Sequence, residues 1–396
     1  MKILITTDWY KPVINGVVAS VDSLCDELLS MGFEVRILTL SGSPHSYIKG
    51  NVYYIGSVRA DVIYPQARAR IRWDRLLIKE LIDWKPDIVH SQCEFSTFIP
   101  AKRISNLTGA ALVHTWHTAY QDYTHYVLPE GMSGCTLDRA KKGAVKIFSE
   151  FICNKTDAVI APSKKVADML QLCDIDSEIY VIPSGIDLER LSKAKETGRS
   201  EVRQAFNIPE DEFLLVYVGR IAREKNLDEI LYIMKNMKDK DQRLLIAGDG
   251  PYRKELEEKA KELGIFDRII FAGMVSPLEV SKYYRAGDLF VNASTSETQG
   301  LTYIEAMACE VPVLCRRDEC LKDVIKQGEN GFLYDTKEEF DEILSLLKNN
   351  KDLRAKIAAG AYETAAIKFC ASVFASCCAQ LYKSLKDDYD SVTPAG

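Results

Sequence analysis

What this sequence of 396 residues lacks excludes several classes of protein. No apolar run approaches the roughly 20 residues that a membrane-spanning helix needs, and Asp8 comes too early for the apolar segment of a signal peptide. The 11 cysteines are odd in number and none has C-x-x-C spacing, so we expect reduced thiols rather than disulfides or a zinc site. A net charge of −6 argues against general nucleic-acid binding. These absences leave a cytoplasmic protein, either soluble or attached peripherally to a membrane.

Short apolar runs rich in β-forming residues alternate with helical segments along the whole chain. In the first half the expected strands are residues 2–6, 34–39, 52–55, 87–91, 111–114, 158–161 and 179–182. In the second half they are residues 213–218, 243–247, 269–271, 289–292, 311–314 and 331–333. Their hydrophobicity is continuous rather than alternating, which is typical of parallel sheets covered on both faces. The fold class is therefore α/β, with two doubly wound, Rossmann-like domains.

The seam between the domains falls in the polar, strand-free segment around residues 185–205. We expect an N-terminal domain over residues 1–195, a C-terminal domain over residues 196–366, and a helical tail over residues 367–396 that packs back on the first domain. In open α/β sheets, ligands bind at the carboxyl ends of the strands. Two such domains facing each other would line a cleft with these strand-end loops.

The strongest motif is Glu297-x7-Glu305, in which Glu297 lies in the loop after a strand ending near Ser294 and Glu305 lies in the second turn of a helix starting at Gly300. The first amides of that helix, at Gly300, Leu301 and Thr302, form an anion site suited to a diphosphate. Glu305 is a carboxylate on an otherwise apolar helix and needs a partner, which the two hydroxyls of a ribose would supply. The alternative is an ordinary helix with two surface glutamates.

This strand–loop–helix segment resembles the signature of the GT4 family of retaining glycosyltransferases, whose fold is GT-B. Other segments resemble further motifs of that family: the N-terminal loop 7–17 with Gly16, the active-site histidine at His117, the hinge strand 183–187, and the phosphate-binding pair Arg220 and Lys225. One position departs from the family pattern. Glu310 stands where the family often has glycine in the turn after the helix.

The resemblance assigns roles to these residues. Arg220 and Lys225 would stabilise the negative charge of a departing nucleoside diphosphate; without Glu297 and Glu305, a solvated basic loop would be the favoured interpretation. Further donor contacts implied by the family come from Gly16, Gly250, Val275, Glu297, which orients the sugar, and His117, which contacts the sugar hydroxyls. The family needs no covalent nucleophile. We expect no metal, because Asp174-x-Asp176 and Asp239-x-Asp241 both precede a strand, at the edge opposite the ligand.

Two segments of the first domain bear on the acceptor. The stretch containing Tyr120, Tyr123, His125 and Tyr126 resembles bacterial diacylglycerol glycosyltransferases within the family. Residues 138–155 form a basic amphipathic helix with Arg139, Lys142 and Lys146 on one face, suited to an anionic membrane surface. The alternative is a helix packed on its own sheet with a solvated basic face.

The sequence thus predicts a monomeric, metal-independent enzyme without a cofactor, on the cytoplasmic face of the cell membrane. It would move glucose or galactose from a UDP-sugar to diacylglycerol or a glycosyl-diacylglycerol and form an α-glycolipid. Two alternatives stay open: a GT4 enzyme that uses a soluble or polyprenyl-linked acceptor, and a protein that binds nucleotide sugars without catalysis.

Overall fold

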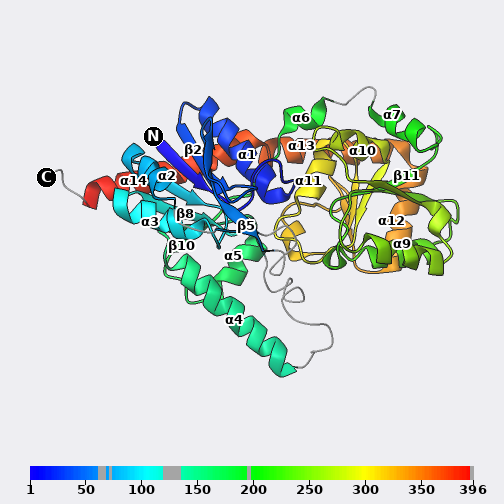
Figure 1. Cartoon of the computed structure of the whole chain (residues 1–396). Coiled ribbons are helices and arrows are strands. Elements are labelled where there is room, and N and C mark those ends of the chain that lie inside the picture. The colour runs from blue at the N-terminus through cyan, green and yellow to red at the C-terminus, as the bar shows by residue number, and fades with distance from the viewer. Residues whose placement is uncertain (61–67, 71–73, 119–134, 194–197, 393–396) are drawn as a thin grey trace. The chain divides into compact units, whose positions relative to one another are not determined.

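The computed structural model describes residues 1–60, 68–70, 74–118, 135–193 and 198–392, without the side chains of residues 135–142 and 388–392. The chain forms two compact units, each built on its own sheet (Figure 1). Unit 1 contains residues 1–185 and 371–396, and unit 2 contains residues 186–370. The boundaries predicted from the sequence were residues 195 and 366.

In the described residues, unit 1 has an eight-stranded sheet in the order β10-β9-β8-β7-β1-β2-β4-β3, parallel except for the pair β3–β4. Its strands are β1 (Lys2–Thr6), β2 (Glu34–Leu40), β3 (Tyr47–Lys49), β4 (Val52–Ile55), β7 (Ile88–Ser91), β8 (Ala111–Thr115), β9 (Ala158–Ala161) and β10 (Glu178–Val181). A separate antiparallel pair joins β5 (Ser57–Arg59) to β6 (Arg68–Arg70). β3, β5 and β6 were not predicted from the sequence, because three residues are too few to show a hydrophobic period.

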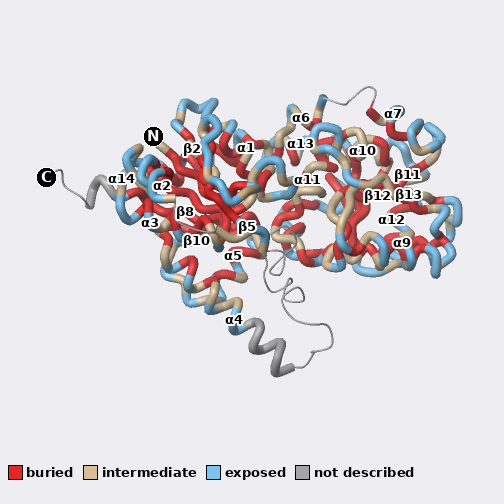
Figure 2. The backbone as a smooth tube through the Cα atoms, viewed as in Figure 1, coloured by how far each residue is buried: buried red, intermediate tan, exposed pale blue. Residues whose placement is uncertain are grey.

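Helices cover both faces of this sheet, because its side chains alternate. Ile3 and Ile5 of β1 belong to the core that contains α1 and α14, whereas Leu4 belongs to the core on the opposite face with α2, α3 and α5. The helices of unit 1 are α1 (Gly16–Ser30), α2 (Arg75–Trp84), α3 (Phe98–Thr108), α4 (Cys135–Cys153), α5 (Lys164–Gln171) and α14 (Ala371–Val392). Figure 2 shows the central strands as buried segments and the outer parts of the helices as exposed, and β3 at the edge of the sheet is exposed.

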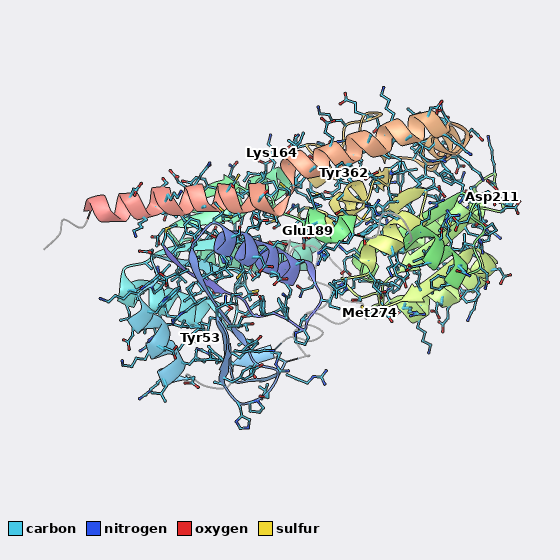
Figure 3. The ribbon with its side chains drawn as sticks, turned by 90° about the horizontal axis from the view of Figure 1, so that it is seen from above. Tyr53, Lys164, Glu189, Asp211, Met274 and Tyr362 are labelled. Carbon is cyan, nitrogen blue, oxygen red and sulfur yellow. The ribbon has the colours of Figure 1, made fainter. Side chains whose placement is uncertain are left out.

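The helical tail predicted over residues 367–396 contains the end of one helix and a second, separate helix. α13 (Lys351–Lys368) ends at a break where Cys370 bridges Ile186 and the Ile186 amide donates to the carbonyl of Phe369 at 2.8 Å. After the break, α14 lies beside α1 in unit 1 (Figure 3), which confirms that the last helix returns to the first domain. Gly185 is needed there, since an added Cβ would lie 2.6 Å from Cα of Ala371.

Unit 2 has a six-stranded, fully parallel sheet in the order β13-β12-β11-β14-β15-β16 in the described residues. Its strands are β11 (Leu214–Val218), β12 (Arg243–Ala247), β13 (Ile269–Gly273), β14 (Leu289–Asn292), β15 (Val313–Arg316) and β16 (Phe332–Tyr334). Its helices are α6 (Leu188–Ser192), α7 (Gly198–Ala205), α8 (Leu227–Asn236), α9 (Arg253–Glu262), α10 (Val280–Ala286), α11 (Leu301–Ala308), α12 (Lys337–Asn349) and α13. Two Rossmann-like domains are therefore confirmed.

Two local differences in unit 2 have physical causes. β15 starts at Val313 rather than at residue 311, because Pro312 has no N–H to donate to a neighbouring strand. Glu310, at the position where the resemblance led us to note a missing glycine, has φ = 59°. The turn after α11 thus keeps the left-handed backbone that glycine adopts easily, with a side chain that adopts it rarely.

Candidate functional site

The loop after β14 leads into the N-terminus of α11 at the carboxyl edge of the unit 2 sheet. Gly300 caps α11 with φ = 78°, and an added Cβ would lie 2.6 Å from the ring of Tyr303. Glycine is therefore required at this position, and the predicted helix start is confirmed. The backbone amides of Leu301 and Thr302, in the first turn of α11, have no partner within the helix by position.

Lys225 and Glu297 come from different strand-end loops and form an ion pair. Nζ of Lys225, which ends a 3-10 turn after β11, lies 2.7 Å from Oε1 of Glu297 in the β14–α11 loop. The two side chains are only 17% and 13% exposed, so solvent screens this pair less than a surface pair. The structure thus brings together two residues that the sequence analysis proposed for one site.

Arg220 is held by a carboxylate that the sequence analysis missed. Its guanidinium is paired with the buried side chain of Glu224, and its carbonyl accepts from the hydroxyl of Tyr217 at 3.0 Å. Glu224 is itself fixed, because its carbonyl accepts from Oγ of Ser296 at 3.0 Å. The sequence did contain a signal for this pair: Glu224 is an acidic residue in a basic loop, four residues after Arg220, a spacing at which ion pairs form readily.

Close packing of two strand-end loops places Gly250 beside the loop of Arg220. The amide of Ile221 donates to the carbonyl of Asp249 at 3.0 Å, and an added Cβ on Gly250 would lie 2.2 Å from the carbonyl oxygen of Ile221. Gly248 is equally tight, with 1.9 Å from an added Cβ to the carbonyl oxygen of Gly219. The glycines thus allow two backbones to meet at this edge. Val275, after β13, packs half-buried against the core.

Glu305 faces partners inside unit 2. Its Oε2 accepts from the hydroxyl of Tyr284 on α10 at 2.8 Å, and its Oε1 lies 3.9 Å from a guanidinium nitrogen of Arg190 on α6. Burial raises the pKa of Glu305, while the hydrogen bond from Tyr284 opposes that rise. The carboxylate therefore has the protein partners that its position demands, and its contact with a ribose stays a prediction.

At the carboxyl edge of the unit 1 sheet, His117 follows β8 and is hydrogen-bonded to Gln92, which follows β7. Its Nε2 lies 2.7 Å from Oε1 of Gln92. Burial lowers the pKa of His117 to about 4, although the nearby charge of Glu94 opposes this shift. The ring is therefore neutral at pH 7. Gly16 begins α1 at the same edge, after the cap residue Asn15.

Two buried carboxylates at this edge were not identified as site residues from the sequence. Asp8 follows β1 and accepts from the amides of Ser96 and Thr97 at 3.0 and 2.8 Å and from the Thr97 hydroxyl at 2.7 Å, which places a carboxylate at the start of α3. Glu94 follows β7, and its Oε1 lies 3.6 Å from Nε2 of His114. The signal that was available is the polar run directly after two predicted strands.

Replacing Asp8 by Asn should change how stability depends on pH. Burial raises the pKa of Asp8 from 3.8 to about 6, so the folded protein binds this proton more tightly than the unfolded chain does. Wild-type stability should therefore rise relative to Asp8→Asn as the pH falls through 6, by about 1 kcal/mol between pH 7 and pH 5. Urea unfolding at both pH values measures this, and a difference independent of pH would contradict the raised pKa.

The predicted acceptor and membrane residues are only partly described. Tyr120, Tyr123, His125 and Tyr126, and the side chains of Arg139 and Lys142, lie outside the described residues. The third predicted cation, Lys146, is described, and its Nζ lies 3.6 Å from a carboxylate oxygen of Glu150 and 3.6 Å from one of Asp174. Lys146 is thus not a free cation on the helix surface.

The predicted apolar face of α4 divides between core and solvent. Ile152 is buried and Phe148 packs against the core of unit 1, as expected for a helix on its own sheet. Ile147 and Phe151, one turn apart, are 68% and 56% exposed. Nζ of Lys155 lies 3.3 Å from the ring centroid of Phe151. In Figure 1, α4 extends away from the sheet of unit 1.

The two Asp-x-Asp strings lie before strands, as predicted. Asp174 and Asp176 precede β10, and Asp239 and Asp241 precede β12, where Asp239 is paired with Lys348 of α12. Within the described residues, no group of three or more His, Cys, Asp or Glu side chains is arranged to hold a metal ion. Across the same part of the chain, none of the helices combines the length and the apolar character needed to cross a bilayer.

Comparisons with known proteins show which family the chain matches. The family description "Glycosyltransferase Family 4" matches residues 14–190, and "Glycosyl transferases group 1" matches residues 198–364. The chain is 34% identical to the alpha-monoglucosyldiacylglycerol synthase of Streptococcus pneumoniae, over 84% of this chain and 75% of that protein. It is 31% identical to the synthase of the same name from Acholeplasma laidlawii, over 98% of both chains.

Solved structures share the fold at lower identity. HepE of Anabaena, crystallised with UDP and glucose, superposes with a TM-score of 0.74 at 18% identity, over 97% of this chain and 100% of that one. Sucrose-phosphate synthase of Thermosynechococcus elongatus gives a TM-score of 0.75 at 19% identity, over 98% and 99% of the two chains. At such identities the likeness concerns the fold alone.

Proposed function

This chain belongs to the GT4 family of glycosyltransferases, and from that membership we propose that it transfers glucose or galactose from a UDP-sugar to a diacylglycerol-based acceptor. The acceptor is diacylglycerol or a glycosyl-diacylglycerol, and the product is an α-glycolipid. The names of the two relatives at 34% and 31% identity support this acceptor class and the α linkage. The observation that carries the proposal is the cluster of Arg220, Lys225 and Glu297 beside the start of α11.

In the proposed reaction, the cationic cluster binds the diphosphate of the donor. Arg220 and Lys225 face the two negative phosphates, and the first amides of α11 donate to phosphate oxygens. As the bond between the sugar C1 and the phosphate oxygen breaks, UDP gains negative charge that these groups stabilise. The acceptor hydroxyl attacks C1 from the side of the departing phosphate and gives its proton to a phosphate oxygen, so the anomeric configuration is retained. The fixed cations of the protein do the work that a metal does in other transferases.

Labelled donors and lipid vesicles test this proposal directly. The purified protein is incubated with radiolabelled UDP-glucose or UDP-galactose and liposomes of anionic lipid that contain diacylglycerol, with EDTA present. Labelled glycosyl-diacylglycerol that is cleaved by an α-glucosidase or α-galactosidase is the expected product. Turnover with water-soluble or polyprenyl-linked acceptors alone would contradict the lipid acceptor. Tight UDP binding without turnover on any acceptor would contradict catalysis itself.

We further propose that Ile147 and Phe151 of α4 insert into the membrane surface on which the acceptor lies, with Lys155 beside them. Both side chains are more than half exposed, and they are one turn apart on a helix whose adjacent positions, Phe148 and Ile152, pack on the core. Burying two large apolar side chains in the interface contributes about 1.5 to 3 kcal/mol each.

The double change Ile147→Ser and Phe151→Ser should therefore weaken binding to anionic vesicles by tenfold or more. Co-sedimentation with vesicles of phosphatidylglycerol and phosphatidylcholine measures the change. Leu278→Ser is the matched control, since Leu278 is 78% exposed in unit 2 and has no part in the proposed surface. Equal sedimentation of all three proteins would place the membrane contact elsewhere.

A further inference from the structure

A chain of hydrogen bonds leads from His117 into the core of unit 1. Oε1 of Gln92 lies 2.7 Å from Nε2 of His117, and the amide nitrogen of Gln92 lies 3.0 Å from Nε2 and 3.2 Å from Nδ1 of His90. His90 in turn contacts Tyr382, whose hydroxyl lies 2.6 Å from Nδ1. Tyr382 belongs to α14, so this helix is connected to His117 through the side chains of His90 and Gln92.

The hydrogen-bonded side chains behind His117 are all buried, which makes their arrangement specific. His90, Gln92 and Tyr382 have almost no exposed surface, and Thr115 occupies the remaining ring nitrogen of His90 with a contact of 2.7 Å from its Oγ1 to Nε2. A buried polar group that loses its partner is not compensated by water. Each member therefore holds the next in one orientation.

We propose that Gln92 is a positioning residue that fixes the tautomer of His117. An amide oxygen only accepts hydrogen bonds, so Nε2 of His117 carries the proton and donates it to Gln92. The neutral ring then keeps its lone pair on Nδ1. His90 and Tyr382 hold the amide group of Gln92 in this orientation.

The fixed tautomer has a chemical consequence that rests on the proposed function. If His117 lies beside the transferred sugar, its Nδ1 accepts a hydrogen bond from a sugar hydroxyl and does not donate one. A ring free to change tautomer would present an N–H to the same hydroxyl in part of the molecules. By fixing the tautomer, Gln92 therefore favours a single orientation of the bound sugar.

The charges around His117 keep the ring neutral, so a single tautomer can be observed. Within the described residues, Glu94 from the loop after β7 raises its pKa and His114 of β8 lowers it, and His90 of β7 also interacts with it. Burial is the larger effect and lowers the pKa to about 4. At pH 7 the only question is which nitrogen holds the proton.

Nitrogen NMR on protein labelled with ¹⁵N at histidine answers that question without substrate. The chain has five histidines, and His117→Ala assigns the signal of interest. We expect His117 of the wild type to be protonated at Nε2. In Gln92→Met, His117 should show a mixture of the two tautomers. In Tyr382→Phe, part of His117 should likewise carry its proton on Nδ1. A wild-type ring protonated at Nδ1, or an unchanged tautomer in Gln92→Met, would overturn the inference.

Kinetics give a second, independent readout. Gln92→Met should lower kcat by roughly tenfold to a hundredfold with little change in the KM for the donor, because alignment rather than affinity is lost. Gln92→Glu keeps an acceptor oxygen and adds a negative charge, so the acid limb of its pH profile should move to higher pH. Gln327→Met is the matched control, since Gln327 makes a comparable pair of hydrogen bonds with the backbone of Leu333 in unit 2.

The NMR measurement and the activity assay together distinguish a failure of this inference from a failure of the proposed function. The tautomer is read without any donor or acceptor, so an incorrect tautomer overturns the role of Gln92 alone. A correct tautomer together with no turnover on any UDP-sugar would contradict the proposed function and leave the assignment of Gln92 standing. Gln92→Asn, which keeps the amide on a shorter side chain, replaces Gln92→Met if that variant does not fold, and it should show the same mixture of tautomers.

Discussion

Lys225→Ala should lower kcat by about a hundredfold to a thousandfold and weaken UDP binding, with the fold unchanged. The size follows from the loss of one fixed charge aimed at the leaving group in a site shielded from solvent. The variant also leaves Glu297 without the cation that lies 2.7 Å away. A nearby carboxylate without its cation repels the phosphates, which adds to the loss.

Steady-state kinetics and isothermal titration with UDP measure both effects. Lys259→Ala is the matched control, since Nζ of Lys259 also lies 2.7 Å from a carboxylate oxygen, that of Asp228, in the same unit. Lys225→Arg keeps the charge but not its point geometry, so it should recover part of the binding and less of kcat. Wild-type kinetics in Lys225→Ala would remove this residue from the site.

The largest loss of stability is expected from Arg203→Met. The side chain of Arg203 has no exposed surface, and it connects α7 to the strand β14 through an ion pair of 2.8 Å with Asp288. Its Nε also donates to the carbonyl of Ala286 at 3.0 Å, and one further nitrogen donates to the carbonyl of Glu212 at 2.9 Å. Without Arg203, Asp288 loses its buried cation and keeps the amide of Leu214 and the partly exposed Arg199, and several carbonyls lose the guanidinium donor, which costs about 3 to 5 kcal/mol.

Arg199→Met is the control for this prediction. Arg199 pairs with the other oxygen of Asp288 at 3.1 Å, but its side chain is 33% exposed, so its loss should cost about 1 kcal/mol or less. Chemical unfolding of the two variants gives the comparison. Equal losses of unfolding free energy would show that burial does not set the strength of this pair.

Much of the fold could be predicted because parallel strands covered on both faces are unbroken apolar runs. β9 and β12 are examples, and their predicted bounds match the structure. The α11 start was predictable from Gly300 and from the polar loop before it. The short strands β3, β5 and β6 were not, since they depend on pairing with neighbours rather than on a pattern of their own.

Candidate site residues could be predicted where the side chain itself would contact the ligand. Residues that only hold another side chain in place were harder to predict. Arg220 and Lys225 stand out as cations after a strand, but nothing in the sequence says that Glu224 holds Arg220. Gln92 has the same character: it is one polar residue among several after β7, and its role appears only when His90 and Tyr382 are seen behind it. Contacts between residues far apart in the chain decide such roles.

The division of the chain imposes an order on biosynthesis. Unit 2 is one continuous segment, residues 186–370, whereas unit 1 needs α14, which follows the whole of unit 2 in the sequence. During translation the later segment can therefore reach its final structure while the earlier one still exposes the surface of α1 and the β1 side chains that α14 covers. A truncated chain that ends at residue 370 should carry a folded unit 2 and an incomplete unit 1.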